Sequence, residues 1–163
     1  MKRSPLTGGR LPVALLMLAS ATTLLAALFF QYVGGLAPCV LCIWQRWPYV
    51  AVLVLGLVAI AAGPRLRAAV LALMAATFLV GAGVALFHVG VEQHWWAGTS
   101  GCGVTATADS LEALSAQVLN APVVRCDEVP WSLFGISMAG YNFVISLVLA
   151  AAALVSARPA FRG

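Results

Sequence analysis

Four long apolar runs, each with at most one charged residue, constrain this chain more than any other feature of its sequence. They extend over residues 11–32, 42–62, 68–91 and 136–157. A helix needs about 20 apolar residues to cross the hydrocarbon layer of a bilayer. With 63% hydrophobic and 9% charged residues, the chain also lies outside the composition of soluble domains. The sequence therefore predicts an all-α integral membrane protein, a four-helix bundle that residues 1–163 form as a single domain.

The first run also has features of a secretory signal. Basic residues precede it, and Ala19-Ser20-Ala21 imitates a cleavage site. Its apolar length, which continues to Phe30, favours a retained span instead. With this span counted, we expect both chain termini on the same side of the membrane.

The distribution of charge predicts the orientation of the bundle. Positive residues accumulate on the cytoplasmic side of short loops. One end of the expected bundle carries Lys2, Arg3, Arg10, Arg65, Arg67, Arg158 and Arg162. The other end carries Arg46, Arg125, Glu92, Asp109, Glu112, Asp127 and Glu128. We therefore expect cytoplasmic termini, and the net charge of +4 reflects membrane topology and does not indicate nucleic-acid binding.

Residues 92–135 form the one sizeable segment expected outside the membrane. Within it, residues 108–120 have the capping and spacing of a short amphipathic helix. Cys102 and Cys126 flank this helix, on the side of the membrane where disulfides persist. A disulfide between them would close a loop worth roughly 3 kcal/mol of stability. The spacing of this pair leaves a structural and a redox role open.

A Cys-X-X-Cys motif, Cys39 and Cys42 in "PCVLCIWQR", stands at the start of the second expected span, with Arg46 four residues further on. If this helix begins near Pro38 or Cys39, the spacing of i, i+3 and i+7 places the three side chains on one stripe. A helix N-terminus and a nearby cation both favour thiolate over thiol. The motif therefore predicts a reactive thiolate at the membrane surface.

Other uses of these residues remain open. The motif could ligate zinc, although the remaining cysteines are 24 residues apart and a closed zinc site needs further ligands at compact spacing. We therefore predict no metal site. Arg46 could bind lipid headgroups. His88 could hydrogen-bond Glu92 one turn later, although an intramembrane histidine is also a candidate functional residue.

Two cysteine pairs at one end of the bundle indicate two-electron exchange. The sequence lacks the GxGxxG of dinucleotide sites, and Ile43 stands where a haem-attachment motif has histidine. A membrane quinone, ubiquinone or menaquinone, is the two-electron acceptor that suits a dithiol at bilayer depth. Arg46 could stabilise negative charge on a quinone oxygen.

The chain resembles the disulfide-bond formation protein B (DsbB) family of bacterial inner-membrane thiol oxidases. The likeness covers nearly the whole chain, including four spans and the order of all four cysteines. It is carried by "PCVLCIWQR", "FHVGVEQ" and "CDEVPWSLFGISM". The resemblance implies a multi-pass protein of the bacterial inner membrane that reoxidises a periplasmic DsbA-like thioredoxin-fold protein and reduces a quinone.

The resemblance also implies roles for individual residues. Cys102 would form the mixed disulfide with the partner protein, and Cys126 would pair with Cys102 and pass the exchange to Cys39. Cys42 would face the quinone as a thiolate. Arg46 and His88 would lie near the quinone ring.

Two other functions remain as alternatives. A vitamin K epoxide reductase-like enzyme also joins four helices to cysteine pairs and quinones, but that family places its Cys-X-X-Cys at the start of a late helix. A transporter or scaffold with structural disulfides would instead show paired charges or broken helices inside the membrane.

Overall fold

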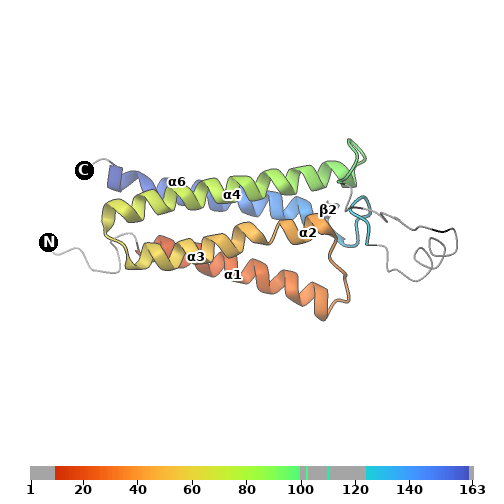
Figure 1. The fold of residues 1–163 in the computed structure, drawn as a ribbon, viewed down its shortest axis with the longest axis horizontal. Coiled ribbons are helices and arrows are strands. Elements are labelled where there is room, and N and C mark those ends of the chain that lie inside the picture. Colours follow the sequence, from red (N-terminus) through yellow and green to blue (C-terminus); the bar gives the residue numbers. More distant parts are fainter. Residues whose placement is uncertain (1–9, 100–101, 103–109, 111–123, 162–163) are drawn as a thin grey trace.

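The computed structural model describes residues 10–99, 102, 110 and 124–161. Four helical segments in this part of the chain are long and apolar enough to cross a membrane, and they pack side by side (Figure 1). They are α1 (Arg10–Tyr32), α2 and α3 together (Val40–Ala61), α4 (Pro64–Glu92) and α6 (Met138–Phe161). The predicted all-α membrane bundle is therefore confirmed. The predicted short helix at 108–120 lies outside the described residues, except for Ser110.

The second span is interrupted, so the prediction of one continuous helix is wrong. It consists of α2 (Val40–Trp44) and α3 (Trp47–Ala61), with turn residues Gln45 and Arg46 between them. Pro48 explains the break, because it has no N–H to donate to the carbonyl of Trp44 and is tolerated only in the first turn of a helix. Cys39 and Cys42 therefore do not share one uninterrupted helix with Arg46.

Both ends of the described chain lie at the same end of the bundle, together with the turn between α3 and α4 (Figure 1). Arg67 stabilises this turn, since its Nε donates to the carbonyl oxygen of Ala59 at 3.0 Å. Cys39 and Cys42 lie at the opposite end, where the chain enters α2.

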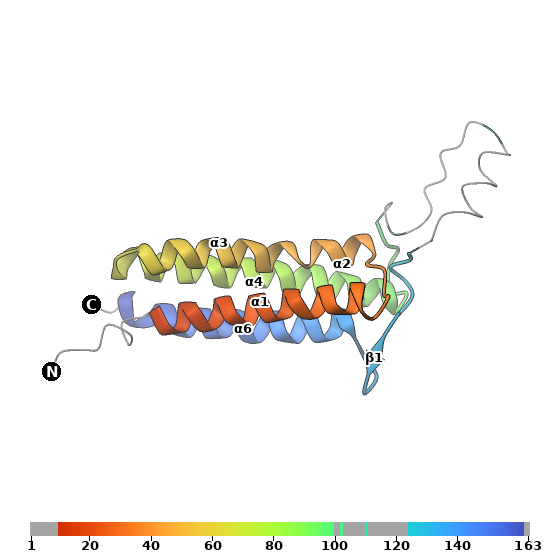
Figure 2. The same ribbon diagram turned by 90° about the horizontal axis from the view of Figure 1, so that it is seen from below.

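A short β-hairpin precedes α6 and was not predicted (Figure 2). Strand β1 (Ser132–Leu133) pairs with β2 (Ile136–Ser137) in antiparallel fashion. Phe134 and Gly135, which connect them, have φ angles of 52° and 77°. A two-residue turn needs such positive φ angles to match the twist of its strands. The last span consequently begins at Met138 instead of residue 136.

Apolar side chains from alanine to phenylalanine and tyrosine fill the centre of the bundle. The main buried cluster combines residues of α1, α3, α4 and α6, including Val13, Leu16, Tyr49, Val52, Leu71, Met74, Phe78, Ala150 and Ala153. Large apolar side chains also cover the outside, among them Leu18, Leu25, Val54, Leu57, Leu79, Val80 and Val148. Such an apolar exterior fits contact with lipid tails.

Gly90 allows Trp96 to pack against α4. A Cβ atom at position 90 would lie 2.0 Å from Cζ2 of Trp96. The indole stacks on Phe87 at 5.9 Å and donates from Nε1 to the carbonyl oxygen of Phe87 at 2.9 Å. We expect Gly90→Ala to displace this indole and to lower the free energy of unfolding by about 1–3 kcal/mol.

Thermal unfolding in detergent, followed by tryptophan fluorescence, measures this effect. Gly83→Ala is the matched control in the same helix, because nothing lies within 4 Å of a Cβ atom at position 83. Equal stability of the two alanine variants would contradict the assigned packing.

Candidate functional site

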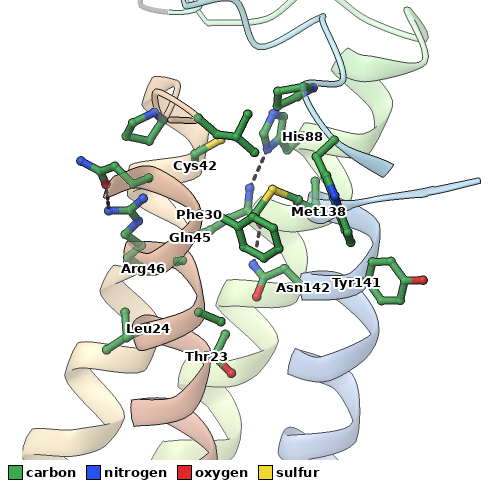
Figure 3. A pocket seen from close by; sticks show the side chains of 18 of the residues that line it. Thr23, Leu24, Phe30, Cys42, Gln45, Arg46, His88, Met138, Tyr141 and Asn142 are labelled. Carbon is green, nitrogen blue, oxygen red and sulfur yellow. Dashed lines mark hydrogen bonds between the residues drawn. The ribbon is translucent and has the colours of Figure 1, made fainter. Parts of the chain in front are cut away.

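A cavity of about 330 Å³ opens among the helices at the end of the bundle that holds Cys39 and Cys42. Residues of α1, the α1–α2 connection, α2, α3, α4 and α6 line it (Figure 3). The lining is largely apolar, with Leu24, Phe30, Trp131, Met138 and Ile145 among its members. Cavities of this size and character commonly bind small organic molecules.

Cys39 and Cys42 lie at the start of α2, next to this cavity. Cys39 is the N-cap residue, and its Sγ accepts a hydrogen bond from the backbone N–H of Cys42 at 3.2 Å. The two sulfurs are 2.8 Å apart and are not joined in a disulfide. Cys39 is buried, whereas Cys42 lines the cavity. The pair therefore has one sulfur turned to the cavity and one behind it.

His88 of α4 contacts the buried member of this pair. Its Nε2 lies 3.6 Å from Sγ of Cys39, and its Nδ1 lies 2.7 Å from Nε2 of Gln45. The amide of Gln45 can only donate through that nitrogen, so Nδ1 is an acceptor and the ring hydrogen lies on Nε2. His88 thus directs an N–H donor at Cys39, and its predicted position near a quinone stays a prediction.

A chain of hydrogen bonds extends from His88 across the bundle (Figure 3). Asn142 of α6 donates through Nδ2 to Oε1 of Gln45 at 2.5 Å. Tyr49 of α3 in turn donates its hydroxyl to Oδ1 of Asn142 and contacts the hydroxyl of Ser146 at 3.0 Å. These side chains connect α3, α6 and the turn between α2 and α3 to the imidazole ring.

The carbonyl oxygen of Leu41 fixes the direction of this chain. It accepts from the backbone N–H of Gln45 at 3.1 Å and from Nε2 of the same residue at 3.3 Å. Rotating the amide of Gln45 by 180° would place its oxygen against the oxygen of Leu41. The amide therefore keeps its nitrogen toward His88.

The surroundings of Cys39 favour its thiolate. The neighbouring Cys42 thiol and the N–H of His88 lower the pKa of Cys39 below its ordinary value, and burial only partly offsets them. The sequence predicted a stabilised thiolate at this helix start. The structure places the stabilising donors around Cys39, whereas Cys42 is the sulfur at the cavity.

Arg46 and Cys42 line the same cavity, whereas the predicted role of Arg46 beside a quinone stays a prediction. Its Nη1 donates to Oε1 of Gln31 in α1 at 2.7 Å. The break between α2 and α3 gives Arg46 this position, and a continuous helix is not required for it. The guanidinium therefore connects α1 to the α2–α3 junction at the wall of the cavity.

Cys102 and Cys126 form a disulfide, with their Cα atoms 5.1 Å apart. Cys126 is fully buried and belongs to the same apolar cluster as Cys39, Leu41 and Val91. Cys102 is half-buried and packs against that cluster. The fold thus gathers all four cysteines at one end of the bundle, although Cys102 and Cys126 are far along the sequence from Cys39 and Cys42.

Sequence reasoning missed the amides and assigned Glu92 no role in the site. Gln45 and Asn142 are polar residues inside otherwise apolar spans, and this was the signal that could have identified them. Glu92 is buried beside the cavity and accepts a hydrogen bond from the hydroxyl of Ser137 at 2.5 Å. Its Oε1 lies 3.9 Å from Nε2 of His88, which is too long for the predicted hydrogen bond.

Comparison with known proteins identifies the family to which the chain is similar. Residues 9–156 match the family model described as Disulfide bond formation protein DsbB. No solved structure matches the chain significantly.

Three relatives named Disulfide bond formation protein B illustrate the similarity. The protein from Aeromonas salmonicida is 35% identical over 128 residues, which cover 76% of this chain and 73% of the relative. The protein from Saccharophagus degradans is 31% identical over 149 residues, covering 88% and 90%. The protein from Herminiimonas arsenicoxydans is 29% identical over 137 residues, covering 82% and 85%. With its four membrane-spanning helices and its cysteine pairs, this chain belongs to the disulfide bond formation protein B family.

Proposed function

We propose that this protein reoxidises a periplasmic, DsbA-like thioredoxin-fold protein and passes the electrons to a membrane quinone, ubiquinone or menaquinone. It would thereby sustain disulfide formation in other proteins. The observation that carries the proposal is the position of Cys42, which lies on an apolar cavity between membrane helices while its partner Cys39 is buried behind it. Family membership supports the same activity.

The cavity fits a quinone headgroup in chemical character. Its lining is mainly apolar, and it includes the N–H groups of His88 and Arg46, which can donate hydrogen bonds. A bound quinone would accept two electrons and two protons. Arg46 would stabilise negative charge on the ring oxygens, and His88 would lie within reach of the same headgroup.

The two cysteine pairs can relay electrons by thiol–disulfide exchange. The partner dithiol would attack the Cys102–Cys126 disulfide, and the partner leaves oxidised while this pair becomes a dithiol. That dithiol would next reduce a Cys39–Cys42 disulfide, with Cys126 attacking Cys39. Each exchange moves two electrons, and the protons of the attacking thiols pass to the sulfurs that leave.

Within the Cys39–Cys42 pair, the residues divide the chemistry. Cys42 faces the cavity and would pass the electrons to the quinone. Attack of Cys126 on Cys39 would expel Cys42. Attack of Cys102 on Cys126 would then break the Cys126–Cys39 bond and expel Cys39. The N–H donors from His88 and from the start of α2 would stabilise the departing Cys39 thiolate. Reoxidation then restores the Cys39–Cys42 disulfide.

We further propose that the protein lies in the bacterial inner membrane with both termini in the cytoplasm. The basic residues at the end of the bundle that holds the termini support this orientation. The segment 92–135 and the cysteines would then face the periplasm, where disulfides persist.

The alternatives considered from the sequence have less support. The family match favours a DsbB-type enzyme over one of the vitamin K epoxide reductase type. A scaffold with purely structural disulfides would have no use for the free Cys39–Cys42 pair beside a cavity.

A coupled assay with purified protein tests the proposed function. Reduced thioredoxin-fold partner and a soluble quinone analogue are added, and the quinol and the partner disulfide are both quantified. We expect one quinone to be reduced for each partner disulfide formed. Oxidation of the partner without quinone reduction, or no reaction with either, would contradict the proposal.

Arg46→Lys tests the interaction with the quinone. Lysine keeps the positive charge but loses the planar group that can bind Gln31 and a second acceptor at once. We expect the KM for quinone to rise roughly tenfold, because the loss of about one hydrogen bond to a charged group weakens binding by about that factor. The rate of thiol exchange with the partner should remain unchanged.

Arg65→Lys is the matched control, since Arg65 is exposed at the opposite end of the bundle. If both lysine variants had the same KM for quinone as the wild type, Arg46 would be a lipid anchor.

A further inference from the structure

Three side chains at the start of α2 and in α4 bring metal-ligating atoms together. One ligand atom from each of Cys39, Cys42 and His88 lies within 4.8 Å of the other two. The sequence argument against zinc considered only the spacing of the cysteines, and therefore left out His88, which is 49 residues from Cys39.

The distances among these atoms suit a tetrahedral cation. Zinc binds cysteine sulfur at about 2.3 Å and histidine nitrogen at about 2.0 Å, so neighbouring ligand atoms lie roughly 3.5–3.8 Å apart. Sγ of Cys39 and Nε2 of His88 are 3.6 Å apart. The two sulfurs, at 2.8 Å, need to separate by a side-chain rotation. The backbone N–H that Cys42 donates to Sγ of Cys39 also stabilises a metal-bound thiolate.

We propose that the dithiol form of this protein binds a thiophilic divalent cation such as Zn²⁺ through Cys39, Cys42 and His88. Two of the three ligand residues line the cavity, so the fourth coordination position faces that space. Glu92, buried nearby with Oε1 3.9 Å from His88, adds negative charge that favours a cation. Binding requires free thiols but neither quinone nor partner protein, and thus does not rest on the proposed function.

The redox state of the cysteines controls this binding. Each cation takes the place of two thiol protons, which are released to solvent. A Cys39–Cys42 disulfide offers no thiolate and would not bind. The cation would therefore hold the pair in its reduced form and block its oxidation until it leaves.

The hydrogen bonds around His88 oppose the cation. A histidine that binds metal through Nε2 carries its hydrogen on Nδ1 and donates it to an acceptor. In this protein Gln45 presents an N–H donor to Nδ1, and the carbonyl oxygen of Leu41 holds the amide in that orientation. Asn142 adds a second hydrogen bond that would have to rearrange. A carboxylate at position 45 would instead accept the hydrogen from Nδ1.

Cobalt titration of the full-length protein tests the site. A Cys102→Ser/Cys126→Ser background leaves Cys39 and Cys42 as the sole thiols. The reduced protein in detergent is titrated with Co²⁺ without quinone or partner. We expect a thiolate-to-cobalt charge-transfer band that saturates at one equivalent and disappears when Zn²⁺ is added. The oxidised protein should give no band.

Variants in the same background identify the ligands. His88→Leu and Cys42→Ser should weaken Co²⁺ binding at least roughly tenfold, whereas Gln45→Glu should strengthen it roughly tenfold or more. Thr77→Ala is the matched control, because the hydroxyl of Thr77 donates within α4 to the carbonyl oxygen of Leu73, away from the three ligand residues. Circular dichroism verifies that each variant retains its helices.

The inference fails if reduced protein with intact helices gives no charge-transfer band. It also fails if His88→Leu leaves the titration unchanged, because the cysteines alone would then hold the cation. The coupled thiol–quinone assay is independent of both results. Normal turnover without cobalt binding would overturn the metal site and leave the proposed function standing.

Discussion

Replacing Cys42 by serine is expected to abolish quinone reduction, with a loss of roughly a thousandfold or more, as found when an enzyme loses its reacting nucleophile. Of the two free cysteines, Cys42 is the one that lines the cavity. A serine at position 42 cannot form a disulfide with Cys39, so the pair could not be reoxidised. Quinone absorbance in the presence of reduced partner measures the rate.

The same variant should still oxidise partner protein once. Its Cys102–Cys126 disulfide is intact, so each molecule can accept two electrons from one partner dithiol before the reaction stops. Quantifying free thiols on the partner should therefore reveal a single stoichiometric burst. This burst shows that the variant is folded. Multiple turnovers with quinone would refute the role given to Cys42.

Replacing His88 by leucine is expected to raise the pKa of Cys39. The N–H of His88 is one of the groups that lower this pKa, together with the Cys42 thiol. A thiol with a higher pKa has less thiolate at a given pH, so its alkylation profile moves to higher pH. At a pH below the midpoint of the profile, we expect alkylation of Cys39 by iodoacetamide to slow roughly tenfold for each unit of the shift.

Mass spectrometry of the reduced protein can measure alkylation of Cys39 separately from that of Cys42. His88→Gln is the matched variant, because its amide retains an N–H donor and should shift the profile less than leucine does. If His88→Leu did not change the pH dependence of Cys39 alkylation, the imidazole would not stabilise the Cys39 thiolate.

The spans and the reactive end of the bundle could be predicted from the sequence. Hydropathy and length identify membrane helices because lipid imposes both requirements on every span. The motif at Cys39 and Cys42 indicated redox chemistry because its spacing is local to one helix start. Each of these signals lies within a short stretch of chain.

The break in the second span could have been foreseen, since Pro48 was visible within an apolar run. The apolar run was long enough to suggest one helix, and its length was given more weight than the missing N–H of Pro48. The hairpin at residues 132–137 was missed because its two-residue strands are too short to show alternation.

The hydrogen bonds to His88 could not be predicted from one sequence. Gln45 is 43 residues from His88, and Asn142 is 97 residues from Gln45. Their contact depends on how α4 and α6 are rotated about their own axes. The apolar faces of these helices give little information on rotation, because lipid and core both accept the same side chains.

The burial of Cys126 determines the regiochemistry of attack by an incoming thiolate. A soluble protein can approach the half-buried Cys102 sulfur, whereas Cys126 is 0% exposed. Cleavage at Cys102 expels Cys126 as the leaving group, into the apolar cluster that contains Cys39. Under the proposed function, electrons would therefore enter at the Cys102 sulfur and leave at the cavity that Cys42 lines, so the order of burial alone would give the transfer its direction.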